Sequence, residues 1–112
     1  MTVENAIDLF DVREKQALAF CTIYKERLKY EDLQEAIDNY CNNMAESFIE
    51  AHSQFFANEN ARIQVTKYLH SIGADKQHSG KRFHEAMYNQ IANIKDKRTD
   101  EFVEYTNLEK DL

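Results

Sequence analysis

The residues of this chain that are best suited to chemistry are its four histidines, two cysteines and twenty acidic residues. Helical di-iron bundles hold metal through a glutamate followed three residues later by a histidine, and no glutamate in the sequence has a histidine at that distance. Zinc sites commonly use closely spaced cysteine pairs, whereas Cys21 and Cys41 stand far apart along the chain. We therefore predict no metal site and no cofactor.

Motifs of nucleophilic catalysis are also absent from the sequence. There is no Gly-x-Ser-x-Gly turn and no glycine-rich phosphate loop. Cys21 and Cys41 fall within apolar helical patterns, where a thiol is protonated and unreactive. Most carboxylates occupy the polar positions of these patterns, which is typical of a solvated surface rather than of an acid–base pair. The sequence predicts no catalytic residue, so we expect a protein that is not an enzyme.

The stretch from Ala61 to Arg98 is a basic centre between two acidic flanks. It holds eight of the fourteen lysines and arginines but three acidic residues, in a chain whose net charge is −6. Such an asymmetry indicates a face that meets an anionic partner. The candidate macromolecule-binding residues are the basic ones around the start of an expected helix: Lys76, His78, Lys81, Arg82 and His84.

A helix-turn-helix is one interpretation of this stretch. Two expected helices, Arg62–Ile72 and Ser79–Ile94, flank a loop that contains glycine, and basic residues that open the second helix would contact phosphates. Against it, Ser79 stands where the short-turn motif needs an apolar residue, and the negative net charge opposes non-specific DNA affinity. A solvated basic face is the other interpretation, and the sequence leaves both open.

The elements that must position these residues are helices. The chain has no proline and two glycines, so it lacks the turn residues that sandwiches and barrels need. Apolar residues recur at steps of three and four, and capping residues separate the runs. We expect main helices over residues 11–30, 33–55, 61–72 and 79–94, and short ones over 3–10 and 99–108. The predicted fold is all-α, a compact bundle of four main helices with short accessory helices at both termini, in one domain over residues 1–112.

The apolar stripe from Leu33 to Phe55 is the longest in the sequence. We expect its helix to form an antiparallel hairpin with the preceding one. The stripe exceeds what a bundle of this size needs for its core, and surplus apolar positions on a long helix commonly serve a dimer or partner groove. Ile49, Phe55 and Phe56 are the candidate residues of such a face. Alternatively, the short terminal helices cover them.

The same sequence indicates a soluble protein. No apolar run approaches the ~20 residues that cross a bilayer, and the first residues lack the basic and apolar regions of a secretory signal. Unpaired cysteines are typical of a reducing compartment. We therefore expect a cytoplasmic protein without a membrane partner.

These observations favour a small non-enzymatic regulator that binds a protein partner, as anti-factors, inhibitors and adaptors do. Six tyrosines and seven phenylalanines supply aromatic anchors for such binding. The alternative is a DNA- or RNA-binding regulator that uses the basic region 76–98, with the acidic N-terminal hairpin as its dimerisation or effector part. A homodimer is compatible with both.

Overall fold

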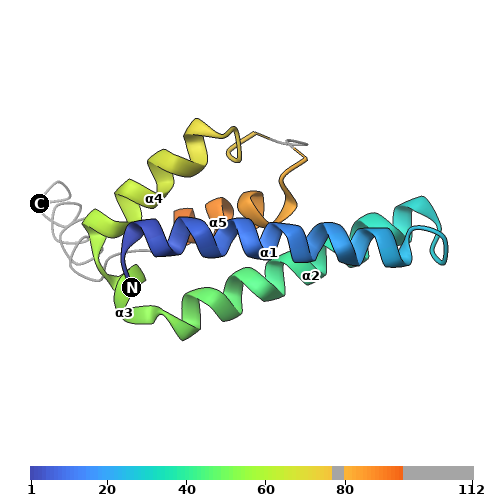
Figure 1. Ribbon diagram of the computed structural model, residues 1–112, viewed down its shortest axis with the longest axis horizontal. Coiled ribbons are helices and arrows are strands. Elements are labelled where there is room, and N and C mark those ends of the chain that lie inside the picture. Colours follow the sequence, from blue (N-terminus) through green and yellow to red (C-terminus); the bar gives the residue numbers. More distant parts are fainter. Residues whose placement is uncertain (77–79, 95–112) are drawn as a thin grey trace, which may run out of the picture.

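The computed structural model describes residues 1–76 and 80–94, and this part of the chain is built from helices without a strand (Figure 1). The helices are α1 (Val3–Tyr24), α2 (Tyr30–Ala51), α3 (Ser53–Ala57), α4 (Glu59–Ser71) and α5 (Arg82–Asn93). Four of them are substantial, which confirms the predicted all-α bundle of four main helices. The accessory helix expected over residues 99–108 lies outside the described residues. In the described part of the chain, no helix combines the length and apolarity needed to span a membrane.

The predicted N-terminal accessory helix is wrong, because the chain forms one uninterrupted helix from Val3 onwards. Thr2 caps this helix, since its hydroxyl accepts a hydrogen bond of 3.1 Å from the backbone amide of Asn5. Asp11, the first residue of the expected helix 11–30, lies inside α1 and directs its carboxylate toward His84. With no glycine or proline between residues 3 and 24, nothing in the backbone interrupts the helix.

The predicted second helix also needs a correction, because it ends at Ala51 rather than continuing to Phe55. His52 leaves the helical conformation, with φ −122° and ψ 40°, and the chain resumes as the short helix α3. This turn brings Phe56 into the core, where its ring lies 6.0 Å from that of Phe48. A straight continuation of α2 would carry the residues after position 51 away from the bundle.

The predicted boundaries of α4 are largely confirmed. Asn58 is the N-cap, and its side-chain oxygen accepts a 3.1 Å hydrogen bond from the backbone amide of Ala61. Gly73 follows the end of α4 with φ 79°, a left-handed conformation that glycine adopts without steric cost. The amide of Ala74 then donates to the carbonyl of Leu69, which closes the last turn.

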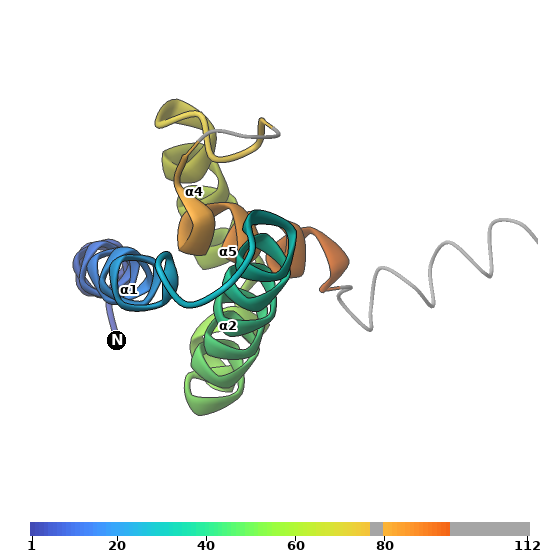
Figure 2. The ribbon, with the colours of Figure 1, turned by 90° about the vertical axis from the view of Figure 1, so that its right-hand side faces the viewer.

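Helix α5 lies in the middle of the bundle. Viewed from the hairpin end, α1, α2 and α4 surround it (Figure 2), and it contacts all three, α2 most extensively. Phe83 and Met87 of α5 are fully buried. The ring of Phe83 lies 6.1 Å from that of Phe10 and 6.5 Å from that of Phe48, so one aromatic cluster joins α1, α2 and α5.

Substitution of Phe10 by alanine should therefore cost about 3–5 kcal/mol of unfolding free energy, because it removes a fully buried ring and leaves a cavity. The midpoint of urea unfolding, followed by circular dichroism, measures this change. Ile63→Ala is the control, since Ile63 is exposed on α4 and the substitution should change stability by less than about 0.5 kcal/mol. Equal midpoints for the two variants would contradict the placement of the core.

Candidate functional site

A buried polar network joins α1 to the start of α5. The two ring nitrogens of His84 face two carboxylates of α1: Nδ1 lies 2.8 Å from Oε1 of Glu14, and Nε2 lies 3.0 Å from Oδ1 of Asp11. His84 is 3% exposed and Glu14 is 9% exposed. The hydroxyl of Tyr68, on α4, donates to the same oxygen of Asp11 at 3.5 Å. Three helices thus meet in one network.

The geometry of this network suits a positively charged His84. A neutral imidazole has one N–H group, so it would face one of the two carboxylates without a hydrogen to donate. The doubly protonated ring donates to Glu14 and Asp11 at once, and its charge is matched by theirs. In that protonation state the contact with Glu14 is a buried ion pair, whereas the side chain of Asp11 is 54% exposed and reaches solvent.

Glu14 also caps α5 from another helix. Its Oε2 accepts from the backbone amide of Phe83 at 3.2 Å, and its Oε1 accepts from the amide of His84 at 3.4 Å. The N-cap residue of α5, Lys81, makes no such side-chain hydrogen bond to its own helix. The expected helix began at Ser79, whereas α5 begins at Arg82. The carboxylate that satisfies the first amides comes instead from the other end of the chain.

The pKa of Glu14 lies below its ordinary value as a result. Burial alone raises the pKa, because it disfavours the charged form. The hydrogen bond from the His84 side chain, the two backbone hydrogen bonds and the positive charge of His84 together outweigh burial. The carboxylate is therefore held in its ionised form.

The structure does not gather the five candidate basic residues into one surface. Lys76 is exposed and Lys81 is half-buried, whereas His84 is buried in the network with Glu14. Arg82 donates to Asp38 at 3.1 Å and also to Gln34, so it binds α5 to α2. His78 lies outside the described residues, as do the basic positions after residue 94.

Helix α5 is also poorly placed for a recognition helix. A helix that reads the major groove must present one face to solvent, but α1, α2 and α4 pack around α5. Apart from Arg82, the residues of α5 that remain exposed or half-exposed include no basic side chain: Glu85, Tyr88, Asn89, Gln90, Ala92 and Asn93. This arrangement does not favour nucleic-acid binding by α5.

The three candidate partner-face residues belong to the core or its margin. Phe56 is 2% exposed, and Ile49 and Phe55 are partly buried against the core. The ring of Phe55 lies 5.1 Å from that of Phe56. Ile49 and Phe55 therefore keep part of their surface open to solvent, whereas Phe56 does not.

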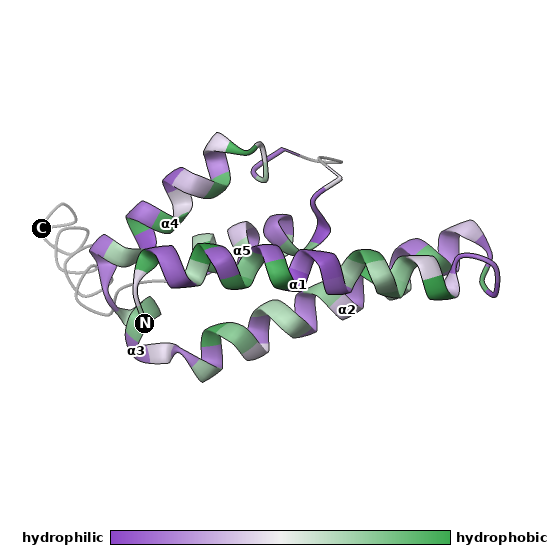
Figure 3. Ribbon diagram, in the orientation of Figure 1, coloured by the Kyte–Doolittle hydropathy of each residue, from purple (hydrophilic) through white to green (hydrophobic). Residues whose placement is uncertain are grey.

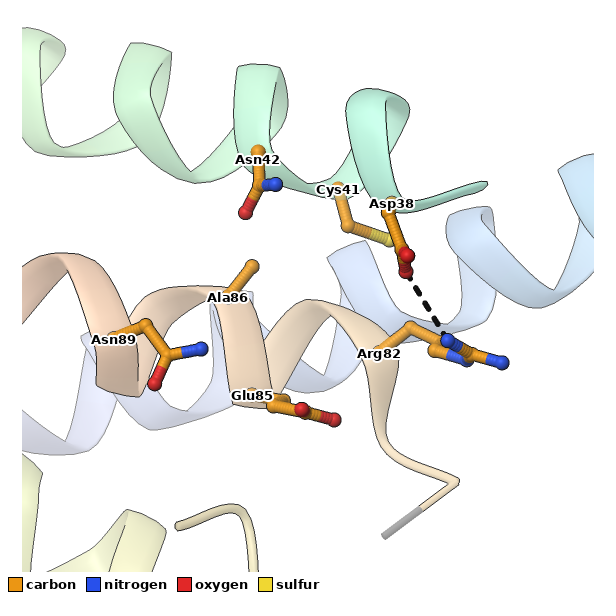
Figure 4. A pocket seen from close by; sticks show the side chains of 7 residues that line it. All are labelled: Asp38, Cys41, Asn42, Arg82, Glu85, Ala86 and Asn89. Atoms are coloured by element: carbon orange, nitrogen blue, oxygen red, sulfur yellow. Dashed lines mark hydrogen bonds and ion pairs between the residues drawn. The ribbon is translucent and has the colours of Figure 1, made fainter. Parts of the chain in front are cut away.

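A small polar cavity of about 270 Å³ lies between α2 and α5 (Figure 4). Asp38 and Cys41 extend from α2, and Arg82 reaches Asp38 from the start of α5. Burial, reinforced by the charges of Glu14 and Asp38, raises the pKa of the Cys41 thiol to about 12. The thiol is therefore protonated at neutral pH and is not a nucleophile. Within residues 1–76 and 80–94, no group of three or more histidines, cysteines or acidic residues is arranged to hold a metal ion.

A larger groove, of about 530 Å³, lies between α1 and α2. Its floor is a row of residues at four-residue steps along α2: Tyr40, Met44, Phe48 and His52. Arg13 and Gln16 of α1 form one rim and are hydrogen-bonded to each other at 2.9 Å. Asn43, Ser47 and Ala51 line it from α2.

The sequence of α2 contains an apolar pattern that indicates this groove. α2 carries two apolar rows at four-residue steps rather than one. The first row is buried: Leu33, Ile37, Cys41 and Ala45. The second row forms the floor of the groove, and apart from Phe48 it is only partly buried. A helix with two such rows presents a wider apolar surface than a single neighbour covers.

No model of a known protein family, no curated protein and no solved structure matches this chain. Its function therefore has to be inferred from the chemistry of these surfaces.

Replacing Glu14 by glutamine should lower the free energy of unfolding at pH 7 by about 1–3 kcal/mol, because His84 loses a buried charged partner. The folded-state pKa of Glu14 is depressed, so its contribution is complete above the unfolded-state pKa, near 4.5, and is lost as the pH falls below it. The difference between wild type and variant should therefore shrink between pH 7 and pH 3. Urea unfolding at each pH measures it, with the exposed Glu46→Gln as control. If the difference in unfolding free energy between wild type and Glu14→Gln does not change with pH, the stability is lost through packing and not through the charge of Glu14.

The two cysteines should differ in reactivity. Cys41 is 1% exposed with a raised pKa, whereas Cys21 is partly exposed. An alkylating reagent at pH 8 should modify Cys21 in the native protein and reach Cys41 only after unfolding in urea, as peptide mass spectrometry will show. Equal modification of both thiols in the native protein would show that α2 and α5 separate readily.

Proposed function

We propose that this chain is a small non-enzymatic regulatory protein that acts by binding a protein partner in the α1–α2 groove. The observation that supports this most directly is the groove itself, about 530 Å³ in volume, with an apolar floor of aromatic and methionine side chains. Neighbouring helices of a bundle normally interdigitate and leave no such space. An apolar floor of this kind is suited to a ligand that is itself apolar on one side.

An amphipathic helix is the partner element that best fits this shape. The row from Tyr40 to His52 extends about 18 Å along α2, since each residue advances the helix by 1.5 Å. Helices that dock in grooves present apolar residues at three- and four-residue steps, which matches the spacing of the floor. Methionine adapts its shape to different ligands, and tyrosine and phenylalanine are frequent anchors in interfaces.

The rim adds a basis for selecting the partner. Arg13 is the charged residue of the lining, and its guanidinium already donates a hydrogen bond at the rim. An acidic residue beside the apolar face of the partner helix would pair with this guanidinium. Asn43, Ser47 and Gln16 supply further hydrogen-bonding groups around the apolar floor, an arrangement typical of interfaces with an apolar centre and a polar margin.

The most chemically capable groups of the described residues support a non-enzymatic role. His84 and Glu14 are buried and bound to each other, and Cys41 is protonated. A general base or nucleophile must reach its substrate, whereas Glu14 and His84 are bound to each other at the start of α5 and Cys41 is 1% exposed.

Filling the groove should abolish partner binding without unfolding the protein. Ser47 is exposed and lines the groove, so Ser47→Arg places a long cation over the apolar floor. In a pull-down from the native host with tagged protein, wild type should recover one protein in stoichiometric amount, and the variant should recover at least tenfold less. Ser71→Arg makes the same exchange at an exposed position of α4 and should bind as wild type does.

Two outcomes would contradict this proposal. The first is recovery of the same partner by Ser47→Arg and by wild type in equal amounts, which would place the partner elsewhere on the surface. The second is an eluate that contains nucleic acid alone, which would favour the nucleic-acid-binding alternative. Circular dichroism of each variant verifies that the helices are intact.

A further inference from the structure

The tip of the α1–α2 hairpin extends beyond the rest of the bundle. α4 and α5 cover the hairpin only in the part remote from its turn, and the turn between Tyr24 and Tyr30 projects past both (Figure 1). Hydrophobic segments nevertheless continue along α1 and α2 up to this turn (Figure 3). The tip therefore carries apolar residues although neither α4 nor α5 covers it.

Three large apolar side chains are exposed at this tip, and a fourth, Leu18, is exposed on α1 before it. Tyr30 is 75% exposed, Ile23 59%, Leu18 54% and Leu28 37%. The described residues contain three other exposed large hydrophobic side chains, which are dispersed over the N-terminus, α1 and α4: Met1, Val12 and Ile63. Single exposed apolar residues are ordinary in soluble proteins, but a group of them marks an interaction surface.

Aromatic side chains pack between α1 and α2 near the exposed apolar residues of the tip. The rings of Phe20 and Tyr40 are stacked at 4.4 Å with an interplanar angle of 10°, and Tyr24 lies 4.7 Å from Phe20. Leu33, in the first turns of α2, is 7% exposed. The tip is therefore held in shape by α1 and α2 alone, and its exposed side chains form a pre-organised surface.

The charges of the tip are separated into two sets. The basic set follows the end of α1 and comprises Lys25, Arg27 and Lys29; the exposed Glu26 lies among them, so three basic residues and one acidic residue leave this segment with a net charge of +2. The acidic set opens α2 and comprises Glu31, Asp32 and Glu35. All six are exposed, and in the part of the chain that the structure describes none of them forms an ion pair within 4.0 Å. A surface with adjacent basic and acidic sets is complementary to a second copy of itself.

We propose that the hairpin tip binds the tip of a second copy of this chain in a two-fold symmetric dimer. The basic set of each copy then faces the acidic set of the other, because a two-fold axis makes every contact occur twice. Ile23, Leu28 and Tyr30 pack around the axis and lose their exposure to water. No residue of the α1–α2 groove takes part, so the dimer presents two grooves to partners.

Sedimentation equilibrium of the full chain tests this dimer, over concentrations from about 1 µM to about 1 mM. Wild type should change from monomer to dimer within this range. The double variant Ile23→Asp with Tyr30→Asp should dissociate at least tenfold more readily, whereas Ile63→Asp, which places the same charge on an exposed position of α4, should dimerise as wild type does.

Charge reversal tests the pairing of the two sets. A variant with Lys25, Arg27 and Lys29 changed to glutamate has an acidic tip, and one with Glu31, Asp32 and Glu35 changed to lysine has a basic tip. Each should be monomeric alone, because like charges face each other across the axis. An equimolar mixture should form a heterodimer that weakens as salt rises.

A wild type that stays monomeric throughout, or a dimer that the tip variants leave unchanged, would overturn the proposal. The dimer can be tested independently of the proposed function, because Ser47→Arg changes the groove and should dimerise as wild type does. Loss of partner capture by Ser47→Arg with an intact dimer supports two independent surfaces, whereas loss of the dimer in Ser47→Arg would overturn the assignment of self-association to the tip.

Discussion

The bundle depends on the contact between the Glu14 carboxylate and the start of α5. One side chain accepts from two backbone amides of α5 and from the buried ring of His84, so it fixes both the position and the direction of that helix. Because α5 lies among α1, α2 and α4, the aromatic cluster of Phe10, Phe48 and Phe83 forms only when α5 is in this position. A buried carboxylate whose oxygens accept hydrogen bonds costs much less desolvation free energy than one buried without partners.

The helices could be predicted from the sequence because their signals are local. Four main helices follow from apolar residues at three- and four-residue steps, and the ends of α4 follow from Asn58 and Gly73. The errors at Asp11 and His52 have a common cause. In both places a local pattern was ambiguous, and contacts with distant residues decided the conformation: Asp11 binds His84, and Phe56 enters the core after the turn at His52.

The functional surfaces were harder to predict because they depend on what covers each helix. His84 and Arg82 look like surface cations in the sequence, but their partners, Glu14 and Asp38, lie seventy and forty-four residues away. The groove follows from the second apolar row of α2, which is visible in the sequence, and from the separation of α1 from α2, which is not. Exposure of Ile23 and Tyr30 likewise follows from where α4 and α5 end.

The central position of α5 has a consequence for how the chain folds. It is the last of the described helices, so during synthesis α1, α2 and α4 emerge before the helix that they enclose. Until α5 is in place, the buried row of α2 and the ring of Phe10 have no cover on that side. Contacts this distant in sequence slow folding and leave apolar surface open to aggregation in the meantime. The nascent chain is therefore most vulnerable just before α5 leaves the ribosome.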